Sequence, residues 1–148
     1  ETQFEDGLQR GVIREFDKDG KVKRSYNAFD YVHQGEIKEY DEFGKLKAAS
    51  FLKPGDGQDR YVKEYYPNGQ VWREAAMVEG KRNGIFKEYF EDGLLKLTGF
   101  YLDDKRDGTF KTFYKNGKIQ NEKVFQGDVK IFSKSYDEHG NLILRLGE

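Results

Sequence analysis

The residues best suited to acid–base chemistry are the two histidines, His33 and His139, because imidazole is the usual base in nucleophilic hydrolysis. Such catalysis also needs a nucleophile and an orienting group that converge on one pocket. His139 lies in a short polar tract before Gly140, which is typical of a turn, and His33 lies in a connection. We therefore interpret both as structural residues and expect no enzyme activity.

Two acidic tracts space their carboxylates as oxygen-donor calcium loops do, namely Asp17-Lys18-Asp19-Gly20 and Asp103-Asp104-Lys105-Arg106-Asp107-Gly108. Neither tract has the glutamate at the twelfth position or the flanking helices of an EF-hand. Hairpin turns favour the same residue types without a metal. The chain also has no Cys, which excludes thiolate ligands and disulfides. We expect neither a metal nor a cofactor.

Basic residues recur at one position of a repeating pattern, and a row of them could follow phosphates of nucleic acid or lipid. The row is Arg14, Lys38, Lys63, Lys87, Lys111 and Lys134. Glutamate follows directly in four cases, at Glu15, Glu39, Glu64 and Glu88. Mixed Lys/Glu surfaces are typical of solvated strands, and the formal net charge of -1 gives no overall attraction to polyanions. We expect no nucleic-acid binding, and we keep membrane association as a minor alternative.

These residues are positioned by an internal repeat whose turns end in glycine. The turn glycines are Gly20, Gly44, Gly69, Gly93, Gly117 and Gly140, spaced by 24, 25, 24, 24 and 23 residues. Each closes a short polar tract, often Asn-Gly or Asp-Gly, which supplies the positive φ that tight hairpins require. The pattern predicts six tandem β-hairpins within residues 1–148.

Three apolar columns accompany the turns. The residue four before each glycine is always aromatic (Phe16, Tyr40, Tyr65, Tyr89, Phe113, Tyr136), and the residue two after it is always aliphatic (Val22, Leu46, Val71, Leu95, Ile119, Leu142). The even separation places both columns on one sheet face. A third column, seven before the glycine, has the opposite parity (Ile13, Ile37, Val62, Phe86, Phe110, Ser133). Either a bulge brings it to the shared face, or each face carries its own apolar stripe.

We therefore predict an all-β fold, an elongated single-layer antiparallel sheet of six hairpins in one repeat domain. A second glycine nine before the turn (Gly11, Gly35, Gly84, Gly108) would let the chain bend between hairpins, and residues 54–59 form the loosest junction. Aromatic residues make up 16% of the chain, which suits a thin sheet because their rings bury area while keeping a polar edge.

The repeat resembles the MORN-repeat family, particularly its bacterial variant, in which a strand ends in Tyr-Tyr-x-Asn-Gly and a Gly-Lys-x-x-Gly link follows. The resemblance is closest at Tyr65-Tyr66-Pro67-Asn68-Gly69 and Gly80-Lys81-Arg82-Asn83-Gly84. It implies an extended sheet without catalytic residues, and roles in protein association, membrane attachment or the antitoxin half of a toxin–antitoxin pair.

The candidate binding residues are Tyr66, Phe90, Tyr114 and Trp72. The first three stand directly before the turn in the central copies, where the outer copies have Asp17, Asp41 and Asp137, so the hairpin does not require an aromatic there. An aromatic row on a charged face indicates a binding surface, and packing against a bulged strand explains it equally well. We leave both interpretations open.

We predict a non-enzymatic module that grips a partner protein on this aromatic face, with antitoxin-like occlusion as its mechanism. A cell-surface glycan-binding or adhesion module is the alternative, since aromatic rows also stack on sugars, and a peripheral membrane scaffold is the third. The apolar strand from Leu142 to Leu146 needs cover, either from the N-terminal segment or from a second chain, and a homodimer through this strand is our hypothesis. The chain opens on Glu1 without an initiator Met, from which we expect an exported or cell-surface protein rather than a cytoplasmic one.

Overall fold

The computed structural model describes residues 2–5, 8–29, 32–52 and 60–147, and the described residues form strands, tight turns and no helix. The predicted hinge at residues 54–59 lies outside them, as does the His33 side chain. The strands are β1 (Thr2–Glu5), β2 (Leu8–Phe16), β3 (Val22–Phe29), β4 (Val32–Tyr40), β5 (Leu46–Leu52), β6 (Arg60–Tyr65), β7 (Val71–Val78), β8 (Lys81–Tyr89), β9 (Leu95–Leu102), β10 (Lys105–Arg106), β11 (Gly108–Phe113), β12 (Ile119–Gln126), β13 (Val129–Tyr136) and β14 (Leu142–Leu146).

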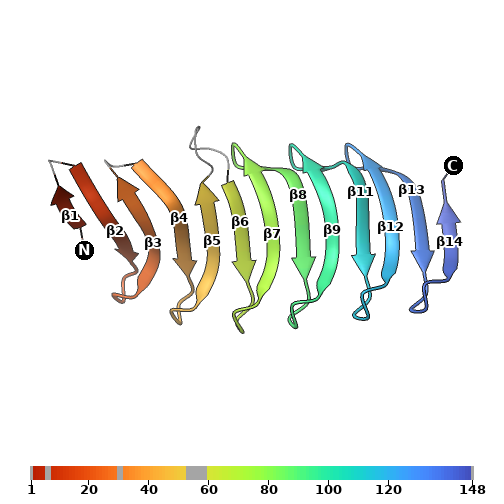
Figure 1. Ribbon diagram of the computed structural model, residues 1–148, viewed down its shortest axis with the longest axis horizontal. Helices are drawn as coiled ribbons and strands as arrows, with labels where there is room; N and C mark the ends of the chain where they lie inside the picture. Colours follow the sequence, from red (N-terminus) through yellow and green to blue (C-terminus); the bar gives the residue numbers. More distant parts are fainter. Residues whose placement is uncertain (1, 6–7, 30–31, 53–59, 148) are drawn as a thin grey trace.

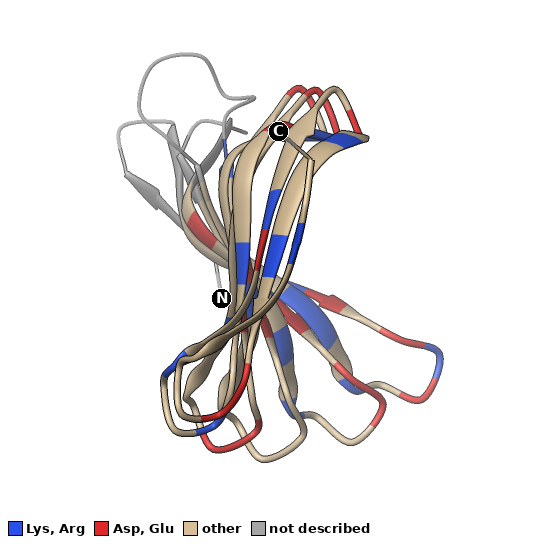
Figure 2. Ribbon diagram, turned by 90° about the vertical axis from the view of Figure 1, so that its right-hand side faces the viewer, with Lys and Arg blue, Asp and Glu red and all other residues tan. Residues whose placement is uncertain are grey.

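The strands form one open antiparallel sheet in which each pairs with its neighbours in sequence (Figure 1). The short β10 pairs only with β9, and β11 takes the next place in the sheet. Seen along the sheet, the strands make a single curved layer (Figure 2). The predicted all-β single-layer architecture is confirmed. Nothing among the described residues forms a helix long and apolar enough to cross a membrane.

All six predicted hairpin turns are present, along one edge of the sheet (Figure 1). In each, the glycine N–H donates to the carbonyl three residues earlier, as from Gly69 to Tyr66 at 2.9 Å. The φ angles of these glycines lie between 77 and 92°, which only glycine adopts without strain. A register shift follows each turn, so that Tyr65 pairs with Val71 while Glu64 pairs with Arg73. Trp72 is therefore the extra residue of a bulge.

The opposite edge holds tighter turns than the sequence suggested. The chain reverses at Glu79–Gly80, Asp103–Asp104 and Gly127–Asp128, where both central residues have positive φ. Two such residues define type I′ hairpins, whose twist matches that of the strands. The strands thus continue through Lys81 and Lys105. Of the predicted bending glycines, Gly11, Gly35 and Gly84 lie inside strands and Gly108 begins β11, and Gly84 (φ 122°) marks the register shift between β7 and β8.

Each sheet face carries its own apolar stripe, which decides between the two interpretations of the third column. The phenylalanine face bears Phe86, Phe110 and Phe125, all buried. Tyr101 stands between Phe86 and Phe110, and successive rings meet edge to face at 5.3 to 5.4 Å between centroids. Such T-shaped contacts add stabilisation beyond the area buried. This ladder crosses hairpin boundaries and forms the thin core.

The tyrosine face bears the regular aromatic column together with the lysines. The Tyr89 and Tyr136 hydroxyls donate to Glu74 and Glu122 on the preceding hairpin. Ala49 is buried beside its cross-strand neighbours Lys38 and Lys63. Long lysine stems cover apolar surface while their ammonium groups stay in water. Both faces therefore pack through contacts between neighbouring hairpins, without a second layer.

Candidate functional site

The predicted aromatic row lies on the phenylalanine face near the lower turns. Tyr66, Phe90 and Tyr114 are half-buried. The Tyr66 hydroxyl donates to the Tyr89 carbonyl at 2.9 Å, and the Tyr114 hydroxyl donates to the Tyr136 carbonyl at 2.8 Å. Each tyrosine thus crosses to the following hairpin. Part of every ring serves to join neighbouring hairpins, and part faces solvent.

The structure explains why the outer copies have Asp at this position. The Asp17 carboxylate accepts hydrogen bonds from the N–H groups of Asp19 and Lys21, and Asp41 and Asp137 do the same in their own turns. In the central copies the oxygen acceptor sits two residues later, as in Asn68, which accepts from the Gln70 N–H. Either arrangement satisfies the turn, so the central copies are free to carry aromatic rings.

Trp72 joins one end of the row. Its ring lies 6.2 Å from that of Tyr66, centroid to centroid, and the Arg73 guanidinium stands 4.3 Å from the indole centroid. Arg73 also donates to Glu64, with Nη2 3.0 Å from Oε1. The bulge turns Trp72 toward Tyr66, so the tryptophan and the row form one surface.

A hollow of about 450 Å³ separates the Phe90 and Tyr114 side chains. Its floor and sides include Leu97, Thr112 and Gln120. Lys96 and Lys115 flank the Phe90 ring, with their ammonium nitrogens 6.0 and 5.5 Å from its centroid. The arrangement is an open aromatic hollow with a charged rim.

The two histidines take no part in this surface. His139 lies in the exposed last turn, where its N–H donates to Asp137 and its carbonyl accepts from Lys118. His33 lies in β4, paired with Ala28, and its side chain is outside the description. The structure brings no base, nucleophile and orienting group together among the residues it describes.

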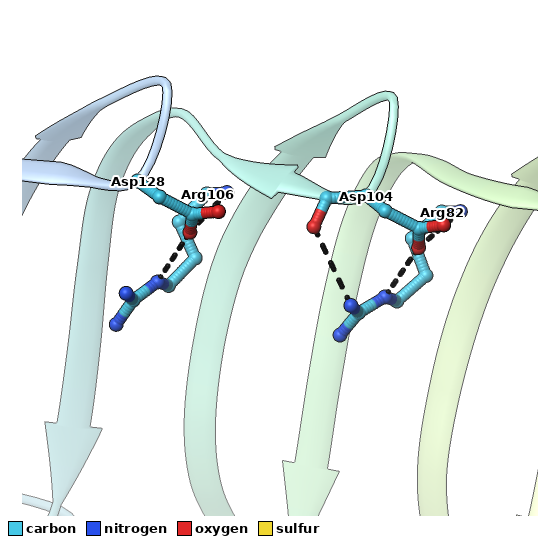
Figure 3. Close-up of polar contacts among 4 residues, drawn as sticks. All are labelled: Arg82, Asp104, Arg106 and Asp128. Carbon is cyan, nitrogen blue, oxygen red and sulfur yellow. Dashed lines mark hydrogen bonds and ion pairs between the residues drawn. The ribbon is translucent and has the colours of Figure 1, made fainter.

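The acidic tract at the upper edge binds arginines of the chain itself. Asp104 accepts hydrogen bonds from the Arg82 N–H at 3.0 Å and from Arg82 Nε at 2.9 Å, and Asp128 accepts the same pair from Arg106 (Figure 3). The guanidinium groups also lie over the Tyr101 and Phe125 rings. No group of three or more His, Asp or Glu side chains in the described part of the chain is arranged to hold a metal.

The basic column lies on the tyrosine face, where glutamates neutralise part of it. Lys38, Lys63 and Lys111 form ion pairs with Glu36, Glu74 and Glu122 at 3.0 to 3.2 Å. Lys87 and Lys134 form none with the described residues. The column is therefore half neutralised.

The Glu74 carboxylate on this face accepts hydrogen bonds from two tyrosine hydroxyls and pairs with Lys63. Burial raises its pKa, but hydrogen bonds from Tyr61, Lys63 and Tyr89 outweigh burial and leave the pKa below its ordinary value. Burial, and to a smaller extent the Glu74 carboxylate, raise the pKa of Tyr89 to about 12. These groups form a structural network that joins three strands.

Sequence reasoning missed a second surface on the tyrosine face. Ile85 and Phe100 are cross-strand partners, and their side chains are 56% and 43% exposed. They belong to a row that crosses the sheet near its upper edge, which we call the upper apolar row: Phe51, Tyr61, Ala76, Ile85, Phe100 and Val124. The signal in the sequence is a pair of columns, eight before and seven after the turn glycine, that hold apolar or aromatic residues in the central copies except for Thr109.

The strand at the C-terminal end of the sheet is also apolar and exposed. β14 pairs only with β13, and Leu142, Ile143, Leu144 and Leu146 are all exposed. This is the strand through which we predicted a homodimer, and self-association stays a prediction.

Comparison with known proteins agrees with the repeat. A family model described as a MORN repeat variant matches residues 34–53, 61–77, 82–103 and 106–126. No curated protein matches the chain. Among solved structures, a mutant of S. aureus TarM in complex with fondaparinux, alpha-GlcNAc-glycerol and UDP is similar at a TM-score of 0.48 and 11% identity, over 66% of this chain. The chain spans 19% of that protein.

Proposed function

Since the chain belongs to the MORN repeat variant family, whose repeats generally bind proteins or membranes, we propose that it is a non-enzymatic protein-binding module that grips a partner protein on the phenylalanine face. Tyr66, Phe90, Tyr114 and Trp72 are the anchors. Their rings give the partner rigid apolar contact area, and few side-chain torsions need to be ordered on binding.

The observation that carries this proposal is the hollow between Phe90 and Tyr114. A volume of about 450 Å³ fits one or two partner side chains, and its aromatic walls supply the desolvated contact that dominates interface energies. Lys96, Lys115 and Glu138 stand around it and provide a charged rim. The Tyr66 and Tyr114 rings are already held by hydrogen bonds to the next hairpin, so little of their freedom is lost when the partner binds.

The mechanism that suits a rigid, single-layer sheet is occlusion. A sheet that lies over another protein covers a broad surface of it without entering a cleft. If the partner is a toxin, its functional surface is hidden while the complex lasts, which is the antitoxin-like role.

We also expect the protein at the cell surface or outside the cell, which fractionation of the source cells would test.

A glycan is the second candidate ligand for the same face. The hollow combines the Phe90 and Tyr114 rings with the polar groups of Thr112 and Gln120, and sugars are held by that combination of stacking and hydrogen bonds. Membrane attachment through the basic column is less favoured, because three of its lysines are neutralised by glutamates on the same face.

The test replaces Tyr66, Phe90 and Tyr114 together by Asp, the residue that the outer hairpins have at this position. Turn geometry then stays compatible, and circular dichroism should show an intact sheet. A second triple variant with Ser removes the same rings without adding charge.

Proteins captured by the wild type from the source organism would be identified by mass spectrometry, purified and titrated by calorimetry. Both triple variants should lose binding by about a hundredfold or more. Unchanged affinity of a purified partner for both variants contradicts the proposal, and selective binding on a glycan array would favour the second candidate.

A further inference from the structure

The upper apolar row consists of three runs of cross-strand partners on successive hairpins. Phe51 pairs with Tyr61, Tyr61 with Ala76, and Ile85 with Phe100. Thr109 pairs with Val124, and Val124 with Phe132, which extends the row toward the end of the sheet. At the usual strand separation the row is about 30 Å long.

Two large side chains of the row, Ile85 and Phe100, face solvent, whereas Tyr61 is half-buried and hydrogen-bonded to Glu74. Ile85 is 56% exposed and Phe100 43%, whereas Phe86 and Phe110 of the phenylalanine face are below 10%. Leu102, two residues beyond Phe100 on β9, continues the exposed apolar surface and is 50% exposed. A contiguous apolar strip of this kind is costly in water and marks an interaction site. Packing between hairpins does not account for the exposure of Ile85 and Phe100.

The charge beside the row is basic. Four lysines of the column stand two residues beyond a member of the row or its extension, as Lys63 follows Tyr61 and Lys87 follows Ile85. Lys38 instead follows Glu36, the cross-strand partner of Phe51. The five lysines from Lys38 to Lys134 outnumber the three glutamates that pair with them. Lys87, which has no ion pair with the described residues, lies at the centre.

The opposite border of the row carries charges of both signs. The upper turns carry Glu79 and Asp103, exposed Lys81 and Lys105 follow them, and Figure 2 shows acidic and basic residues at that edge. An anionic bilayer would meet this mixed border as well as the lysines, which weakens its attraction. A second copy of the chain placed face to face would set two lysine columns against each other. A narrow segment of a partner chain can contact the lysines and the row without contacting the upper turns or bringing a second lysine column close.

From this arrangement we propose that the tyrosine face is a second docking surface, which binds an acidic amphipathic segment of a partner protein along the upper apolar row. Apolar side chains of the segment cover Ile85 and Phe100, and its carboxylates pair with Lys87 and Lys134. The proposal is independent of the one for the phenylalanine face, because the two surfaces lie on opposite sides of the sheet and share no anchor.

The test is a selection from a random peptide library displayed on phage, with the whole chain as bait. Peptides retained by the wild type should be enriched in acidic and large apolar residues. One synthesised peptide is then titrated by fluorescence anisotropy, beside a version in which lysines replace its acidic residues. The acidic peptide should bind about tenfold tighter or more, and salt should weaken it.

Two variants locate the site. Ile85→Ser with Phe100→Ser should reduce affinity about tenfold or more with an unchanged melting temperature, since both side chains are exposed. Lys87→Glu with Lys134→Glu should reverse the preference between the two peptides. The triple Asp variant of Tyr66, Phe90 and Tyr114 should bind the acidic peptide as the wild type does, which separates this surface from the aromatic row.

Three results would overturn the proposal: a selection without acidic enrichment, equal affinity of the two peptides, or affinity unaffected by the Ile85 and Phe100 substitutions. Pelleting with vesicles of phosphatidylserine and phosphatidylcholine provides the membrane comparison. Vesicle binding that the Ile85 and Phe100 substitutions abolish, without any peptide binding, would assign the row to a lipid surface instead.

Discussion

The Phe110 ring lies directly over the Cα of Gly99, so that any side-chain carbon at position 99 would overlap the ring. The two residues belong to neighbouring hairpins, on β9 and β11. The absence of a side chain at position 99 therefore allows the aromatic ladder to continue from Phe86 to Phe125.

Replacing Gly99 by Ala should destabilise the protein by about 1 to 3 kcal/mol, the usual cost of overpacking. Urea unfolding followed by circular dichroism measures the change. The double variant with Phe110→Leu tests the cause, because a smaller residue makes room for the methyl group. If Gly99→Ala costs the same with Leu as with Phe at position 110, the contact is not responsible.

The Arg82–Asp104 pair joins two upper turns, and its removal should loosen the edge locally. Asp104→Gly is the suitable change, since Gly80 occupies the equivalent place in the preceding turn and glycine tolerates the φ of 66°. Hydrogen exchange of the Arg82 amide, which donates to Asp104, should become faster. Asp103→Gly in the same turn is the control and should leave that amide unchanged.

The Tyr66 hydroxyl can be separated from its ring. Tyr66→Phe removes the hydrogen bond to the Tyr89 carbonyl and should cost about 0.5 to 1.5 kcal/mol, while the ring remains available to a partner. Tyr114→Phe should behave alike. Phe90, the natural Phe at this position, shows that the fold accepts the change. Stability measured by urea and binding measured by calorimetry should thus respond differently, and a parallel loss of both would argue against separate roles.

Glu74 should make stability depend on acidity. Its folded-state pKa is lowered, so its contribution is present above the ordinary glutamate pKa of about 4.3 and is lost as pH falls through the folded value. Glu74→Gln should lower stability by about 1 to 2 kcal/mol at pH 7, and the gap to wild type should narrow below about pH 4. Melting temperatures across this range give the measurement. Glu79→Gln, in an exposed turn, is the matched control; a gap for Glu74→Gln that stays constant down to pH 3 would contradict the assignment.

Self-association through β14 has a direct test. An antiparallel pair of β14 strands centred on Leu144 would place Leu142 opposite Leu146 of the second copy and keep the two Arg145 side chains apart. Light scattering after size exclusion should show dimers that Leu144→Arg converts to monomers, because the substitution sets two like charges face to face. A wild type that is monomeric at high concentration would remove the prediction.

The sequence by itself determined the hairpins. The turn glycines require positive φ, and the alternation of aromatic and charged residues requires strands with two different faces. Both features depend on neighbouring residues alone, so they can be identified within a single copy of the repeat. The sequence also shows that the outer copies have Asp, as at Asp17, where the central copies have an aromatic residue, as at Tyr66. The structure gives the reason: the turn N–H groups are accepted by this Asp in the outer copies and by the Asn or Asp two residues later in the central ones.

Only the tertiary structure decided how the copies meet. The register shift between β6 and β7 directs Trp72 toward Tyr66. A second register shift, between β7 and β8, precedes Ile85 and Phe100 on the tyrosine face. A one-residue shift changes the face on which a side chain lies, and its position depends on pairing between strands. Contacts such as Phe110 on Gly99 or Arg82 with Asp104 join residues from different hairpins, so the exposed surfaces follow from the assembled sheet.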